Sequence, residues 1–152
     1  MIRFGTGRAR FDDRVIYMIA SRCLDYPSAE TRAMVPDFAA ALDEQGDAAP
    51  VRSLRPLLAQ FAETELDVLQ QAYVECFDLS GKRALYLSYW TDGDTRRRGA
   101  ALARFKDVYR SAGAVVETRG EFPDYLPMLL EFAAGDRVAG RELLTEYRAS
   151  LE

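Results

Sequence analysis

Three consecutive arginines are the residues of this chain that could bind an anion, and two aspartates lie near them. The run Arg96–Arg98 follows a turn that contains Asp92 and Asp94. A guanidinium binds phosphate or carboxylate through parallel hydrogen bonds. Successive helical residues point about 100° apart, so only one or two of the arginines can face one ligand. The turn lacks the glycine spacing of a phosphate-binding loop. The alternative to anion binding is therefore that the arginines are solvated or paired with carboxylates of the protein.

Aromatic residues are concentrated just before this turn. Five of them are too many for one narrow core seam of a helix, and they are Tyr73, Phe77, Tyr86, Tyr89 and Trp90. A surface made of large aromatic side chains beside fixed polar groups is typical of a peptide-binding groove. The same residues could also belong to a helical core, so the pattern alone leaves both interpretations open.

A second unusual stretch, Glu121–Pro127, contains two prolines four residues apart. Both prolines cannot lie in the interior of one regular helix. The simplest solution makes Asp124 the N-cap of a following helix and places Pro127 in its first turn. We expect this entry to hold Asp124 and Tyr125 in fixed orientation beside whatever packs against them.

The composition narrows the possible functions. The 152-residue chain has no histidine, which removes the commonest metal ligand and general base and favours a protein that is not an enzyme. Cys23 and Cys76 lack metal-ligand spacing, and we expect them to be reduced, buried thiols. The net charge of −4 disfavours nucleic-acid binding and suits a basic peptide.

We find no signal peptide and no apolar run of about 20 residues that could span a bilayer. The sequence therefore predicts a cytoplasmic protein with no direct membrane insertion. It also predicts no metal and no cofactor bound by the chain itself.

Apolar residues recur at helical spacing along most of the chain, and no strand alternation is present. We expect an all-α compact bundle of about seven to eight helices, forming one domain over 1–152 with a flexible lead at 1–10. The first predicted helix is capped by Asp12 and stops at Asp25–Pro27, and the second runs from Ser28 to Gly46, where Pro36 kinks or delays it. The third is capped by Ser53 and carries Leu54–Phe61, and the fourth begins at Thr64 with Asp67 in a capping box. The remaining predicted helices are a short one over 83–89, one from Asp94 to Ala112, one over 125–132, and a last one carrying Leu143–Leu151.

Two stretches together resemble a known family. Tyr73–Asp78, Leu85–Gly99 and Phe105–Lys106 resemble the nitrate reductase molybdenum-cofactor assembly chaperones, the NarJ-type branch of the TorD/DmsD superfamily. The stretch Phe122–Phe132 is similar to the Pro-Asp-(His/Tyr) signature of that superfamily, with Tyr125 where some relatives have His. The match is densest over residues 73–134.

The resemblance implies a TorD/DmsD-like, all-helical cytoplasmic chaperone without catalytic activity. Such a chaperone binds the N-terminal peptide of the molybdenum-containing catalytic subunit of nitrate reductase. It promotes insertion of molybdenum bis-guanine dinucleotide, the cofactor that the client carries, and delays premature docking to the membrane partner. Members of the family continue beyond Glu152, so we expect one or more C-terminal helices to be missing.

The resemblance and the aromatic cluster together give the predicted peptide-binding residues, which are Tyr86, Tyr89, Trp90, Arg97, Pro123, Asp124, Tyr125 and Leu130. The alternative is a small phosphate- or nucleotide-binding helical domain that uses Asp92, Asp94 and Arg96–Arg98. A purely structural helical subunit, with a broad apolar face in place of a groove, is a third possibility. The absence of a glycine-rich loop and of histidine favours the chaperone.

Overall fold

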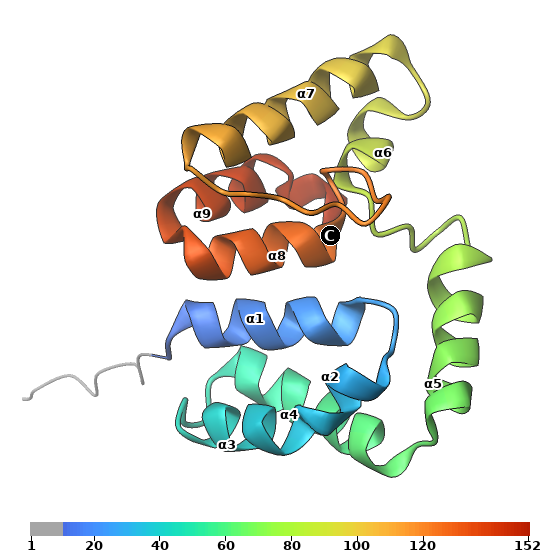
Figure 1. The fold of residues 1–152 in the computed structure, drawn as a ribbon, viewed down its shortest axis with the longest axis vertical. Helices are drawn as coiled ribbons and strands as arrows, with labels where there is room; N and C mark the ends of the chain where they lie inside the picture. The colour runs from blue at the N-terminus through green and yellow to red at the C-terminus, as the bar shows by residue number, and fades with distance from the viewer. Residues whose placement is uncertain (1–10) are drawn as a thin grey trace, which may run out of the picture.

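A computed structural model of the protein describes residues 11–152, and the expected flexible lead at 1–10 lies outside the described residues. Within 11–152 the chain forms nine α-helices, one π-helical turn and one 3₁₀ turn and contains no β-strand, so the predicted all-α bundle is confirmed (Figure 1). The elements are α1 Asp13–Leu24, α2 Ala29–Ala33, α3 Val35–Asp43, α4 Ala49–Glu63, α5 Leu66–Tyr73, the π turn Val74–Asp78, α6 Leu87–Asp92, α7 Arg96–Ser111, α8 Leu126–Gly135, α9 Arg137–Glu146 and the 3₁₀ turn Arg148–Ser150.

Helix α1 lies in the middle of the bundle, between α8 and the pair formed by α3 and α4 (Figure 1). Its apolar residues Ile16, Ile19 and Cys23 are buried, and its most extensive packing is with α8. The buried hydroxyl of Ser21 donates to the carbonyl of Pro127 on α8 at 2.6 Å. Because both of its sides are covered, α1 connects the N-terminal helices to the C-terminal ones.

The buried apolar side chains form two clusters. The first belongs to α1, α3, α4 and α5, and its fully or nearly fully buried members include Ile19, Leu42, Val51 and Leu58. The second belongs to α6–α9 and the turn after α9, and it contains Leu87, Phe105, Tyr109, Leu129, Leu143 and Tyr147. Burial of each such side chain stabilises the fold by about 1.5–3 kcal/mol. The two halves of the bundle therefore have separate cores that meet across α1.

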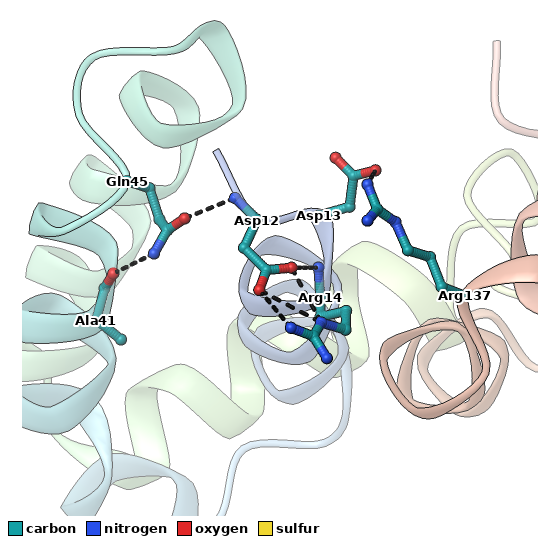
Figure 2. Close-up of polar contacts among 6 residues, drawn as sticks. All are labelled: Asp12, Asp13, Arg14, Ala41, Gln45 and Arg137. Atoms are coloured by element: carbon teal, nitrogen blue, oxygen red, sulfur yellow. Dashed lines mark hydrogen bonds and ion pairs between the residues drawn. The ribbon is translucent and has the colours of Figure 1, made fainter. Parts of the chain in front are cut away.

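The start of α1 is fixed to both halves by polar contacts (Figure 2). Asp12 caps the helix as predicted, since its carboxylate accepts from the Arg14 N–H at 3.0 Å. The Asp12 N–H donates to Gln45 Oε1 at 2.7 Å, just after α3. The Asp13 carboxylate pairs with Arg137 of α9 at 3.2 Å. These contacts set the position of the first helical turn relative to α3 and α9.

Prolines decide where the next helices begin. The predicted interruption at Pro36 is confirmed, because α2 ends at Ala33 and α3 starts anew at Val35 with the proline in its first turn. The predicted cap at Ser53 is wrong. Helix α4 already begins at Ala49, and the Ser53 hydroxyl donates back to the Ala49 carbonyl at 3.2 Å. Pro56 therefore lies inside α4, where the buried apolar face of the helix offsets its missing hydrogen bond.

Three further helix starts differ from the predicted ones. Thr64 does not begin α5 but is the C-cap of α4. Helix α5 begins after Glu65, which makes no side-chain capping hydrogen bond. Helix α7 begins after Thr95 rather than at Asp94. It ends at Ser111, and the positive φ of 72° at Gly113 is a common helix ending. The short helix expected over 83–89 starts only at Leu87. Extended backbone at Tyr86, which pairs with another segment, prevents an earlier start.

The C-terminal helix also differs from its prediction. Helix α9 is capped by Asp136 and ends at Glu146, so Tyr147 follows it and Leu151 is exposed.

Among the described residues, no helix combines the length and the hydropathy that crossing a membrane requires.

The cysteines are both free, as predicted. Cys23 is buried, and burial raises the pKa of its thiol to about 11, while Cys76 is only partly buried. A thiol with that pKa is protonated and unreactive at neutral pH. Cys23 therefore acts as a small core side chain.

Helices α8 and α9 approach each other most closely at Gly140. A Cβ atom built there would lie 2.3 Å from the Ala133 Cα and 2.5 Å from the Ala133 Cβ. Because one of these neighbours is backbone, the helices would have to move apart to admit even a methyl group. Gly99, in the first half of α7, has no neighbouring atom within 4 Å of such a Cβ.

We predict that Gly140→Ala lowers the free energy of unfolding by about 1–3 kcal/mol, as overpacking does. The matched change Gly99→Ala should leave it unchanged or raise it by about 0.5–1 kcal/mol, because alanine favours a helix. Urea denaturation followed by circular dichroism measures both. Equal stability of the two variants would contradict the close approach of α8 and α9.

Candidate functional site

The two stretches singled out in the sequence are brought together by a short antiparallel pairing. Tyr86 and Tyr125 form an isolated β-bridge. The Leu87 N–H donates to the Asp124 carbonyl at 3.1 Å, and the Leu126 N–H donates to the Leu85 carbonyl at 2.7 Å. The pairing sets the starts of α6 and α8 side by side. It therefore places the predicted residues Tyr86, Asp124 and Tyr125 in one region.

Asp124 occupies the interior of this region. Its side chain is fully buried, and Oδ2 accepts from the Ser88 N–H at 2.9 Å and from the Ser88 hydroxyl at 2.6 Å. The prediction that Asp124 is the N-cap of α8 is wrong, because Tyr125 holds that position and makes no side-chain cap bond. Asp124 instead caps α6, since Ser88 lies in the first turn of that helix. The other oxygen, Oδ1, is buried without a hydrogen-bond partner.

The residues on either side of Asp124 are also buried. The Pro123 carbonyl accepts from the Tyr109 hydroxyl of α7 at 2.7 Å. The Tyr125 hydroxyl donates to Asp25 Oδ1 at 3.1 Å and lies 2.8 Å from the Tyr73 hydroxyl. Burial raises the pKa of both Tyr125 and Tyr73, so both phenols stay protonated at neutral pH. Tyr125 thus joins α8 to α5 and to the turn after α1.

Tyr86 is half-buried between this interior and the surface. Its ring packs on Tyr125 and Phe122, with centroid distances of 5.3 and 6.0 Å. Its hydroxyl donates to the Glu121 carboxylate. Burial is the largest cause of the raised pKa of Tyr86, and the hydrogen bond to Glu121 adds to it. Tyr86 therefore supports the aromatic residues outside it.

Three aromatic side chains form the exposed part of the site, and we call them the aromatic surface. They are Tyr89, Trp90 and Phe122, which are 41%, 43% and 51% exposed. The Trp90 Nε1–H donates to the Ala84 carbonyl at 2.9 Å, and the Trp90 ring lies 5.6 Å from that of Tyr89. The indole is therefore held in one orientation while a large part of it stays open to solvent.

The predicted site residues thus differ in burial, and Tyr86 is half-buried. Tyr89, Trp90 and Arg97 are exposed, whereas Pro123, Asp124, Tyr125 and Leu130 are buried. Leu130 lies on α8, the helix that packs most extensively on α1. Whether any of these eight residues contacts a peptide stays a prediction. Phe122 was missed, because the sequence did not show whether a phenylalanine before Pro123 points inward or outward.

The geometry gives no support to the alternative of a phosphate- or nucleotide-binding domain that uses Asp92, Asp94 and Arg96–Arg98 together. Arg98 lies over aromatic rings and Arg96 and Arg97 are exposed, so the three do not converge on one ligand. The Asp92 carboxylate accepts from the Thr91 hydroxyl at 3.0 Å. Residues 11–152 hold no group of three or more His, Cys, Asp or Glu side chains that could bind a metal ion. A shallow hollow lined by residues of α9 lies on another element, away from the aromatic surface.

We predict that the fully buried Asp124–Ser88 contact contributes more to stability than a helix cap that is only half-buried. Asp124→Ala should lower the free energy of unfolding by about 1–3 kcal/mol, because it leaves the Ser88 donors unpaired. Asp136→Ala removes the half-buried cap of α9, which accepts from Val138 and Ala139, and should cost about 1 kcal/mol. Urea denaturation of both variants makes the comparison. If Asp136→Ala were the more costly change, the buried contact would not be the stronger one.

Relatives with known names share most of the chain. A Bacillus subtilis protein named "Probable nitrate reductase molybdenum cofactor assembly chaperone NarJ" is 37% identical over 145 residues, covering 91% of this chain and 76% of that protein. The nitrate reductase-like protein NarX from two strains of Mycobacterium tuberculosis is 40% identical over 138 residues. The match covers 90% of this chain but only 20% of the NarX length.

The fold is also similar to that of a solved structure. A crystal structure described as that of a "Putative Redox Enzyme Maturation Protein From Archaeoglobus Fulgidus" superposes with a TM-score of 0.67 at 21% identity, covering 97% of this chain and 83% of that one. At this identity the likeness shows a shared all-helical fold. The family described as nitrate reductase delta subunit matches residues 33–151. The chain therefore belongs to the nitrate reductase delta subunit family, in the NarJ-type branch that its aromatic and Pro-Asp-Tyr stretches resemble.

Proposed function

We propose that this protein is an assembly chaperone that binds the N-terminal tail of the apo molybdenum-containing subunit of nitrate reductase. In this role it promotes insertion of the molybdenum cofactor into that subunit and delays docking of the subunit to its membrane partner. The observation that carries the proposal is the exposed aromatic surface of Tyr89, Trp90 and Phe122 in a member of this family. The name of the Bacillus subtilis relative supports the choice of client.

The aromatic surface has the physical properties of a peptide-binding site. Large aromatic side chains supply contact area and lose little conformational entropy on binding. Trp90 is already oriented by its hydrogen bond to the Ala84 carbonyl, and Tyr86 supports Phe122 from behind. A partner that covers these rings removes apolar area from water, and preorganised rings reduce the entropic cost of doing so.

The proposed role needs no chemistry from the chain itself. The chaperone acts by binding, and the molybdenum bis-guanine dinucleotide belongs to the client. We place this function in the cytoplasm, where the apo subunit is made. The net charge of −4 suits a tail that carries basic residues and disfavours a nucleic acid as partner.

We predict that Trp90→Ala weakens binding of a synthetic peptide of the client N-terminal tail by at least about tenfold, because a central aromatic anchor typically contributes about 2 kcal/mol or more. Isothermal titration calorimetry measures the affinity, and far-ultraviolet circular dichroism checks the fold. Val138→Ala is the matched control, because Val138 is an exposed apolar residue on α9, outside the aromatic surface. Unchanged affinity of Trp90→Ala would move the binding site elsewhere.

In cells, deletion of the gene should leave the nitrate reductase subunit with a reduced molybdenum content. Purification of the subunit followed by elemental analysis of molybdenum per polypeptide tests this expectation. Re-expression of the parent chain should restore the content, and re-expression of Trp90→Ala should restore it only in part. A subunit that is fully loaded with molybdenum in the deletion strain would contradict the proposed role.

A further inference from the structure

Arg98 differs from its two neighbours in the arginine run. Arg96 and Arg97 are exposed, whereas Arg98 is half-buried against the aromatic surface. Its guanidinium carbon lies 5.0 Å from the centroid of the Phe122 ring and 6.0 Å from that of Tyr89. A guanidinium at such distances from a ring is held by cation–π attraction. Arg98 is therefore the arginine of the run that belongs to the aromatic surface.

The guanidinium of Arg98 is also held from the inside. Its Nε–H donates to the Ser88 hydroxyl at 3.4 Å, and that hydroxyl donates to the buried Asp124 carboxylate. The contact with Ser88 uses one of the five N–H donors of an arginine. Two rings and one hydroxyl together restrict the side chain, so a ligand would meet a guanidinium that has already lost much of its freedom.

The outer donors of Arg98 have no partner in the part of the chain that the structure describes. Over residues 11–152, no hydrogen bond involves its Nη1 or Nη2 and no carboxylate forms an ion pair with it. Neither nitrogen is among the buried polar atoms that lack a partner, so both are open to solvent. The terminal nitrogens of a guanidinium match the two oxygens of a carboxylate, which they bind through parallel hydrogen bonds.

We propose that Arg98 is a specificity-determining residue that binds a carboxylate of the client tail while the aromatic surface covers apolar residues next to that carboxylate. The inference rests on the proposed function and adds to it a requirement on the client, which must carry an Asp or Glu beside its apolar residues. Arg97, which the family resemblance indicates as the binding arginine, is exposed and has no role in this contact.

A double-mutant cycle between protein and peptide tests the contact. The probe is a synthetic peptide of the client tail, and in a second set of peptides each Asp or Glu is replaced by Asn or Gln. The protein variants are Arg98→Gln and the matched control Arg96→Gln, which changes the net charge equally at an exposed arginine outside the predicted peptide-binding residues. Arg98→Lys keeps the charge but loses the planar pair of donors. Thermal unfolding of each variant reports on its folding.

We expect Arg98→Gln to weaken binding about tenfold and Arg96→Gln to change it by no more than about twofold, because an exposed charge contributes little. Arg98→Lys should fall between the two. One amide-substituted peptide should bind the parent protein about tenfold more weakly than the unmodified peptide does. The Arg98→Gln variant, in contrast, should bind that peptide and the unmodified peptide with equal affinity. This non-additivity is the signature of a direct contact.

Other outcomes would overturn the inference. Equal effects of Arg96→Gln and Arg98→Gln would mean that the arginines act on binding only through their general charge. Additive effects of protein and peptide changes, or a tail without Asp and Glu, would exclude the carboxylate contact. If Trp90→Ala weakens the peptide while Arg98→Gln does not, the proposed function stands and only the role of Arg98 fails. A parent protein that does not bind the tail would remove both.

Discussion

The architecture of the site depends on the buried contact between Asp124 and Ser88. A carboxylate that is fully withdrawn from water must be hydrogen-bonded, and Asp124 uses the first turn of α6 for this purpose. The contact thereby fixes where α6 begins relative to the segment that leads into α8. Tyr89 and Trp90 lie on α6, and Phe122 precedes Pro123 on the other segment of the pairing. One polar interaction in the interior thus determines how the three exposed rings are placed relative to one another.

The site is correspondingly layered. Asp124 and Ser88 form its interior, Tyr86 and Tyr125 lie next to them, and the aromatic surface is outermost. Arg98 joins the layers, because it contacts Ser88 on one side and the rings on the other. Rigid inner layers serve recognition, since side chains that are already ordered lose less entropy when a partner binds.

Much of the fold was predictable from local sequence signals. The Asp12 cap, the interruption at Pro36 and the glycine ending of α7 each follow from the chemistry of one or two residues. Local signals failed where distant segments decide the conformation. Asp124 has the sequence context of an N-cap, yet its carboxylate is used by Ser88, which is 36 residues away in the chain. The late start of α6 has the same cause.

The candidate site could be foreseen only in part, for a similar reason. Residue type identified the aromatic residues, but burial depends on tertiary packing. The sequence therefore could not tell that Tyr125 and Leu130 face inward while Phe122 faces outward. Likewise, the choice between Arg97 and Arg98 depends on where one turn of α7 meets the Phe122 segment, and no local pattern encodes that meeting.

The central position of α1 has a consequence for how the protein folds during its synthesis on the ribosome. The residue that Ser21 contacts, Pro127, is synthesised 106 residues later. Chains emerge with their N-terminal part first, so α1 can cover one side with α3 and α4 early but must wait for α8 to cover the other. Closing so long a segment costs entropy before any packing offsets it, and contacts of this range slow folding. One side of α1 therefore stays exposed until α8 has been synthesised. A protein that is proposed to bind an incompletely assembled partner thus itself passes through an incompletely folded state.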